Sequence, residues 1–353
     1  MESFGVSGRL TLLIAVMATA ILFPPLGFAH EAGVLYDQAF SAIKSQEYKK
    51  AKGLLEQAIQ GFPSYPEAHH LLGLVQFELT HETERALPFL QKAVELSPHF
   101  AQAHYDIALL YLYQNNIEAA QSSLKKALES YPRFGEAQLV LAQTLEKQGK
   151  PVPAMDQYQA LLSYHPDQAE ALYGLGYLQF QAGTTEEAQQ TISRLVAAHP
   201  QHTEGWFLSG RLAEMQNMPT DAILAYEKVI ALNPEYSEAH HSLGFLFQQQ
   251  GDFPKAIEHF QTVSRLKPND AEAFINLGVL YAATNQGPKA KEAYLHALTL
   301  KENSPELHFN LGNFYEFHEV DLKEAARHYQ RYVDLGGTDQ RVKKLLEQIG
   351  TTP

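Results

Sequence analysis

Cysteine is absent from this chain of 353 residues. Its absence excludes disulfide bonds, thiolate-bound zinc, iron–sulfur clusters and a cysteine nucleophile. Charged residues are also scarce at 19%, and 40 Asp and Glu outnumber 27 Lys and Arg, which gives a net charge of −13. Nucleic acid is therefore not an expected partner, because its phosphates require clustered basic residues. The chain also contains no Asn-x-Ser/Thr glycosylation site.

Residues 1–29 have the composition of an export signal. Arg9 precedes an apolar run from Leu10 to Phe28, and the small residues Gly27 and Ala29 lie near its end. This order predicts a cleaved signal peptide and a periplasmic or secreted protein. The missing cysteine and glycosylation sites favour bacterial export. The alternative is an uncleaved membrane anchor formed by residues 10–28, which are just long enough to span a bilayer.

Prolines recur with a fixed spacing through most of the chain. Successive members of the series are 34 residues apart: Pro98, Pro132, Pro166, Pro200, Pro234 and Pro268. Such a period indicates a repeat architecture. If each unit begins three residues after its proline, position 8 is always small, position 20 is always Ala, and position 24 is always large and apolar. We expect position 8 to face position 20 of the next helix, and position 24 to fill the gap between neighbouring units.

The centre of each unit carries a turn signal. Position 15 is Gly or Asn in the six central units: Asn115, Gly149, Gly183, Asn217, Gly251 and Asn285. These residue types adopt the left-handed conformation that ends a helix. Prolines follow within three residues in four of the units, where a second helix would begin: Pro151, Pro219, Pro254 and Pro288. Each unit is therefore predicted to be helix A, a tight turn and helix B.

These residues resemble the tetratricopeptide repeat family. Phe274-x-x-Leu277-Gly278-x-x-Tyr281, followed by Ala290 and Tyr294, matches the family pattern closely. The resemblance covers residues 32–337 in nine repeats, at 32–65, 66–100, 101–134, 135–168, 169–202, 203–236, 237–270, 271–304 and 305–337. It implies an all-α fold, an α-solenoid that forms a right-handed superhelix of about nine helix pairs. Residues 338–353 are predicted to form a capping helix and tail, because repeat arrays must cover their last apolar face; a partner-binding helix is the alternative.

The sequence offers no catalytic, cofactor or metal site. It contains no Gly-x-Ser-x-Gly elbow, His-Glu-x-x-His pair or phosphate-binding loop. His69-His70 and His240-His241 are adjacent on predicted helices, so their side chains point about 100° apart and do not chelate one ion easily. In each pair we expect one His to pack in the core and the other to face the groove. Trp206 is expected to be a core residue.

The family resemblance implies a concave groove lined by positions 2, 5, 6, 9, 12 and 13 of each helix A. Those positions hold 13 acidic but only three basic residues, and aromatic side chains recur at position 5. Tyr173, Tyr177 and Phe207 are expected to form a partner site. The full set of expected partner-binding residues is Tyr105, Tyr173, Tyr177, Phe180, Phe207, Arg211, His241, Phe245, Asn276, Phe309, Asn310 and Asn313.

Part of this pattern has a structural explanation. Seven repeats carry Glu at position 2, in the first turn of helix A, where a carboxylate stabilises the helix dipole by about 0.3–1 kcal/mol without any ligand. The aromatic row is either a binding surface or packing hidden by curvature. The asparagines at positions 6 and 9 of the last two repeats are able to bond a peptide backbone.

The combined features predict a non-catalytic scaffold for protein–protein interaction. We expect its partner to be a protein or peptide segment that is apolar with some positive charge, bound in envelope assembly or secretion. No cofactor is expected, and a membrane is expected as a partner only if the N-terminal segment stays uncleaved. The alternative function is a recognition arm of a separately encoded enzyme such as a glycosyltransferase or protease.

Overall fold

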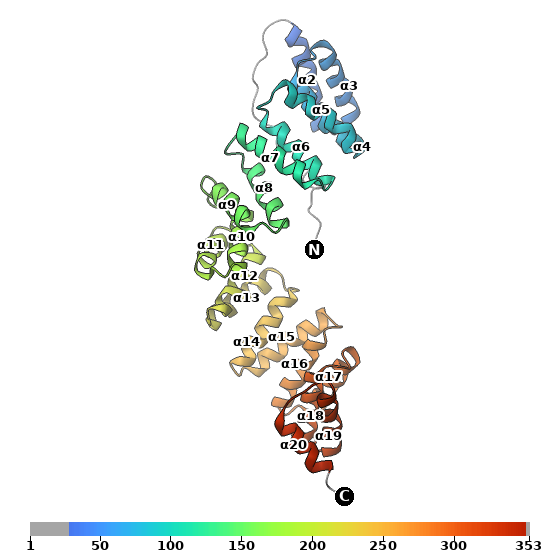
Figure 1. Cartoon of the computed structure of the whole chain (residues 1–353), viewed down its shortest axis with the longest axis vertical. Helices are drawn as coiled ribbons and strands as arrows, with labels where there is room; N and C mark the ends of the chain where they lie inside the picture. The colour runs from blue at the N-terminus through green and yellow to red at the C-terminus, as the bar shows by residue number, and fades with distance from the viewer. Residues whose placement is uncertain (1–27, 351–353) are drawn as a thin grey trace. The chain divides into compact units, whose positions relative to one another are not determined.

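A computed structural model describes residues 28–350, in which every regular element is an α-helix (Figure 1). The predicted export signal lies almost wholly outside these residues. The helices are α2 (Phe28–Lys44), α3 (Tyr48–Gly61), α4 (Pro66–Thr80), α5 (Thr83–Leu96), α6 (Ala101–Tyr113), α7 (Ile117–Ser130), α8 (Gly135–Lys147), α9 (Pro151–Leu162), α10 (Ala169–Gln181), α11 (Thr185–Ala198), α12 (Thr203–Met215), α13 (Pro219–Leu232), α14 (Ser237–Gln249), α15 (Phe253–Leu266), α16 (Ala271–Ala283), α17 (Gly287–Leu300), α18 (Pro305–Phe317), α19 (Leu322–Asp334) and α20 (Gln340–Gly350).

Even-numbered helices from α2 to α18 are the A helices, and the eight of them other than α10 each pack with the B helix that follows. The all-α fold of helix pairs is thereby confirmed. Each pair lies within one predicted repeat, except that α2 begins four residues before the expected start at residue 32. None of the helices within residues 28–350 is both long and apolar enough to cross a membrane.

The turns between A and B helices follow the sequence signal. All six Gly and Asn residues at position 15 have positive φ angles, between 57° and 77°. The left-handed conformation ends helix A there and lets the chain reverse. The prolines expected at the start of helix B also occupy its first turn, where no backbone N–H is needed. Gln46, His81 and Val320 adopt the same left-handed conformation in the remaining repeats, which the sequence did not indicate.

Small residues at position 8 make room for a large side chain in the same repeat. A Cβ atom on Gly210 would lie 2.5 Å from Cε1 of Tyr226, and one on Gly278 would lie 2.5 Å from the ring of Tyr294. Position 20 also faces position 8, as predicted, at Gly73, where a Cβ would lie 3.1 Å from the carbonyl oxygen of Ala86. The nearest atoms, however, belong to position 24, because the large side chain there reaches across to helix A of its own repeat.

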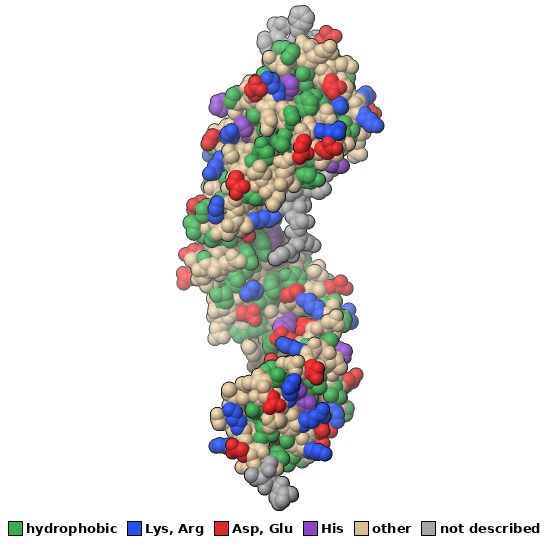
Figure 2. Space-filling view, turned by 45° about the vertical axis from the view of Figure 1, so that its right-hand side comes forward, with side chains coloured by type: hydrophobic (Ala, Val, Ile, Leu, Met, Phe, Trp, Pro, Cys, Tyr) green, Lys and Arg blue, Asp and Glu red, His purple; other side chains and the backbone are tan. Residues whose placement is uncertain are grey.

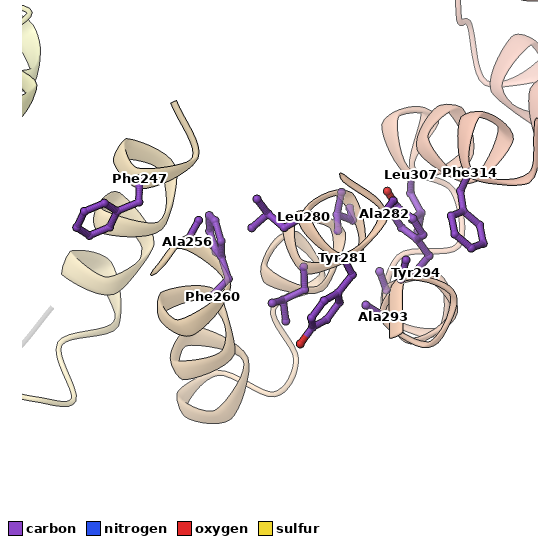
Figure 3. Close-up of a cluster of buried hydrophobic side chains, with 14 of the residues drawn as sticks. Phe247, Ala256, Phe260, Leu280, Tyr281, Ala282, Ala293, Tyr294, Leu307 and Phe314 are labelled. Carbon is purple, nitrogen blue, oxygen red and sulfur yellow. The ribbon is translucent and has the colours of Figure 1, made fainter. Parts of the chain in front are cut away.

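The described chain forms two compact units, divided after Leu178 within α10. Each has its own apolar core built from alanines at position 20 and large residues at position 24. In the C-terminal unit, Phe260 is fully buried, and Figure 3 shows it in one cluster with Leu280 of the next repeat. The cores therefore run between neighbouring helix pairs, as a repeat fold requires.

Helix α20 covers the end of the last helix pair. Val342 is fully buried in the same cluster as Tyr329, and Leu345 and Leu346 pack against that cluster. Arg341 donates to Glu316 at 2.7 Å, to Asn313 at 2.7 Å and to the Tyr329 hydroxyl at 3.0 Å. The helix therefore places one apolar face on the array and leaves a charged face in water.

Candidate functional site in the A helices

The aromatic row at position 5 is largely partnered within the fold. In four repeats the position-5 ring lies 4.9–5.3 Å from an aromatic ring at the last position of the same repeat. These pairs are Tyr36–Tyr65, His70–Phe100, Tyr105–Phe134 and Phe207–Tyr236. The position-5 rings therefore serve partly to pack each repeat together. The aromatic residues that end these repeats were the signal in the sequence that would have shown it.

Residues at three groove positions of the N-terminal unit are buried instead. Tyr105 is only 8% exposed beneath Phe134, which corrects its prediction as an open groove residue. His70 and Asp106 are 0% and 1% exposed, and His70 Nε2 lies 2.6 Å from Asp106 Oδ2. Gln102 donates to both oxygens of the same carboxylate. Burial of the two side chains is tolerated because each is hydrogen-bonded to the other.

Tyr173 and Tyr177 remain partly accessible on α10. Their rings stack with centroids 6.1 Å apart and an interplanar angle of 17°. Both side chains are half-buried and lie one turn apart, so they present a continuous aromatic surface. Phe207, the third member of the expected partner site, belongs to the C-terminal unit.

The C-terminal unit has a cavity of about 420 Å³ between A helices. Three expected site residues line it: Phe207 and Arg211 from α12, and His241 from α14. The other lining residues are Glu214, Ser237, Glu238, Ser242, Val263, Lys267 and Asp270. The cavity is therefore built from α12, α14, α15 and the turn before α16. We call it the α12–α14 pocket.

Aromatic contacts hold the three expected residues in the α12–α14 pocket. The Phe207 ring lies 5.5 Å from that of Tyr226 and 5.1 Å from that of Tyr236. Arg211 places its guanidinium 4.7 Å from the ring centre of Phe180, in a cation–π contact. His241 meets Phe245 edge-on at 4.8 Å. Phe180 and Phe245 thereby support the wall of the pocket.

Carboxylates outnumber cations in the pocket lining. Glu214 accepts a hydrogen bond of 2.5 Å from the Tyr226 hydroxyl, and Asp270 caps α16 by accepting from two backbone N–H groups. Burial opposes ionisation of Glu238, but hydrogen bonds from Lys267, its own backbone N–H and Ser237 outweigh that effect and lower the pKa of Glu238. Three carboxylates face Arg211 and Lys267, so the lining is acidic.

The remaining expected residues are divided between packing and exposure. Phe309 is half-buried with its ring 5.2 Å from that of Tyr332, and Asn310 is half-buried beside it. Asn313 already accepts bonds from Tyr329 and Arg341, so its amide oxygen is engaged inside the unit. Asn276 is only 9% exposed, and its Nδ2 has no hydrogen-bond partner among the described residues. A ladder of freely exposed asparagines is therefore not present at these positions.

Sequence reasoning missed a recurrent hydrogen bond made by position 4. In five repeats a ring nitrogen at this position lies 2.9–3.0 Å from the carbonyl oxygen of the residue six places earlier. The donors are His69, His104, Trp206, His240 and His308. Trp206 is half-buried, so its ring packs while its N–H holds the preceding turn. The regular spacing of these residues was the available signal.

Charged and apolar side chains are mixed over the surface. Acidic, basic and hydrophobic side chains alternate on the face drawn in Figure 2, without one large patch of a single charge. Within residues 28–350, no three His, Asp or Glu side chains gather in a cluster suited to a metal ion.

Family models and one curated relative match the sequence of these repeats. The models described as "Tetratricopeptide repeat" match residues 36–99, 105–158, 145–212 and 271–304, and the model described as "TPR repeat" matches 220–251 and 247–285. The mouse protein named tetratricopeptide repeat protein 21B is 33% identical over 75 residues. That match covers 21% of this chain and only 6% of the mouse protein.

One solved structure supports the fold at low sequence identity. The C-terminal part of a TPR repeat-containing protein from Cytophaga hutchinsonii is 14% identical with a TM-score of 0.59, and the match covers 69% of this chain and 99% of that one. A tetratricopeptide repeat protein from Parabacteroides merdae is 20% identical over 70% of this chain and 97% of its own, with a TM-score of 0.48.

Proposed function

This chain belongs to the tetratricopeptide repeat family, whose members are scaffolds that bind protein or peptide partners, and from that premise we propose that the α12–α14 pocket binds a protein segment that is apolar and carries positive charge. One observation carries the proposal: the pocket combines the Phe207 ring with three carboxylates against two cations. Phe207 would contact an apolar side chain of the segment. Glu214, Glu238 and Asp270 would favour a neighbouring Lys or Arg through electrostatic complementarity.

The size of the pocket fits a few side chains of a peptide better than a large ligand. Its volume of about 420 Å³ is at the small end of the range typical for ligand sites. Tyr173 and Tyr177 extend the proposal to the N-terminal unit, where their stacked rings offer a second contact for the same kind of segment. The envelope setting is also proposed; it is supported by the order of charge, apolar core and small residues in 1–29.

A labelled peptide that repeats the sequence Leu–Lys–Phe–Lys tests the proposal on the whole chain. We expect measurable binding by fluorescence anisotropy, and a loss of about tenfold for Phe207→Ala because an aromatic anchor is removed. Arg211→Ala should strengthen binding, since it removes a cation that repels the peptide. Tyr131→Ala is the matched control, because Tyr131 is an exposed ring at the end of α7. Equal affinity for a peptide with Glu in place of Lys would contradict the proposal.

A further inference from the structure

Two pairs of histidines join helix A to helix B inside single repeats of the C-terminal unit. His240 Nδ1 lies 3.0 Å from His259 Nδ1, linking α14 to α15. His308 Nδ1 lies 3.0 Å from His328 Nδ1, linking α18 to α19. His240, His308 and His328 are 6–8% exposed, and His259 is half-buried.

The hydrogen bonds fix which nitrogen carries each proton. His240 Nε2 lies 3.0 Å from the carbonyl oxygen of Pro234, and a carbonyl only accepts, so this nitrogen must donate. In neutral His240 the lone pair is then on Nδ1, and His259 must donate its Nδ1–H to it. The same argument holds for His308, whose Nε2 lies 2.9 Å from the carbonyl oxygen of Glu302. Each pair is thus complete when both rings are neutral.

Protonation of either histidine pair is energetically unfavourable. A first proton on Nε2 of His259 places a cation in a half-buried site close to Lys255, and a second on Nδ1 of His240 sets two N–H donors against each other. Lys255 is itself held by Asp252, at 3.2 Å, and lies over the Phe247 ring that stacks on His259.

The His308–His328 pair is likewise surrounded by charged and aromatic side chains. Arg327 and Arg331 of α19 disfavour protonation, whereas Glu302 and Glu324 favour it. The Tyr315 ring stacks on His328 with centroids 5.5 Å apart, and Lys291 of α17 lies over the Tyr315 ring. Glu319 lies 3.8 Å from Lys291 and partly balances its charge.

Repeat 4 has a neutral counterpart of these pairs. Gln138 and Gln157 occupy the same two positions, and Gln138 Nε2 donates to Gln157 Oε1 at 2.8 Å. Glutamine therefore makes the same link between the two helices without a group that titrates. Histidine in repeats 7 and 9 adds sensitivity to protons.

We propose that the His240–His259 and His308–His328 pairs are acid-sensitive links between helix A and helix B, which we call fasteners. Opening of the first pair in acid disrupts the α12–α14 pocket. Both helices joined by the first pair line the pocket: α14 supplies His241 and Glu238, and α15 supplies Val263. Loss of the link loosens α14 from α15 and weakens ligand binding. The ligand part of this inference rests on the proposed function, whereas the fasteners do not.

The direction of the pH effect follows from the folded and unfolded states. Burial, then His240 and Lys255, lowers the pKa of His259 from 6.5 to about 4. Burial, then His308 and Arg327, lowers the pKa of His328 to about 4. Between pH 6.5 and 4 the unfolded chain binds more protons than the folded one. The stability is therefore complete above pH 6.5 and is lost as the pH falls toward 4.

The experiment copies repeat 4 into repeats 7 and 9. The variant carries His240→Gln, His259→Gln, His308→Gln and His328→Gln; the control replaces the exposed His99 and His165 by Gln. Melting temperature and amide hydrogen exchange of residues 237–266, corrected for intrinsic rates, are measured at pH 7 and pH 5, with and without EDTA. We expect the parent and the control to melt about 5 °C lower at pH 5 and the variant to lose less than half of that. Equal losses would overturn the fasteners, and so would an acid response that EDTA abolishes, because a metal would then be the ligand.

Two further measurements test the inference even if the variant folds poorly. Ring resonances of the unmodified protein should show His259 titrating near pH 4, and titration near 6.5 would overturn the inference. The Leu–Lys–Phe–Lys peptide should bind the parent about threefold more weakly at pH 5 than at pH 7, and the variant equally at both. Equal weakening in the two proteins overturns the link to the pocket. If no peptide binds at pH 7, the proposed function fails while the melting and exchange results still decide the fasteners.

Discussion

At the scale of single residues, the fold depends on glycine opposite a ring. Gly210→Ala should lower the free energy of unfolding by about 1–3 kcal/mol, because the new Cβ would lie 2.5 Å from the Tyr226 ring. Gly53→Ala is the control: a methyl group on this helical glycine would have no neighbouring atom within 4 Å, so alanine should stabilise by about 0.5–1 kcal/mol. Urea unfolding of both variants checks the prediction. Equal stability of Gly210→Ala and the parent would contradict it.

Val320 illustrates a residue whose backbone conformation disagrees with its side chain. It is 76% exposed and has a φ of 55°, which a β-branched residue adopts only with strain. Val320→Gly should therefore raise the melting temperature, by an amount that corresponds to about 1 kcal/mol. Val152→Gly, also exposed but in the first turn of α9, should lower it slightly, since glycine is a poorer helix former than valine. A decrease in both variants would contradict the strain at Val320.

At the scale of helices, each element is stable only because a neighbour covers its apolar face. Helix α20 supplies that cover for the last repeat through Val342. Val342→Asp should destabilise the C-terminal unit by about 2–3 kcal/mol, because it removes apolar burial and forces a carboxylate against the core. Lys344→Asp on the exposed face of the same helix is the control. Similar urea midpoints for the two variants would show that α20 is not a cap.

At the scale of the whole molecule, the net charge of −13 governs how a basic ligand approaches. Surface charges are screened beyond about 8 Å at physiological salt, so long-range attraction weakens as salt is added. We expect the affinity for the Leu–Lys–Phe–Lys peptide to fall about tenfold or more between low and high salt, mainly through slower association. A peptide with Ser in place of Lys should respond little. Stopped-flow binding separates the rates, and a salt-independent association rate would argue against steering.

The repeat signals predicted the helices because they act locally. Asn and Gly at position 15 fix a left-handed turn wherever they occur, and proline marks the first turn of the next helix. The candidate site was predicted less well. Phe207, Arg211 and His241 do line one pocket, but Tyr105 is buried under Phe134, and Asn313 is bonded to Tyr329. Whether a ring at position 5 is open depends on a second ring almost thirty residues later.

The sequence alone determined the repeat length, the helix pairs and the absence of thiol chemistry, because these follow from local spacing and composition. Tertiary structure alone decided which side chains remain accessible and which are consumed by packing. It paired His240 with His259 and Gln138 with Gln157, and it placed Tyr226 against Gly210. The physical reason is that burial and hydrogen bonding depend on the facing helix. Periodicity states which face of a helix a residue occupies, but not what fills the space opposite.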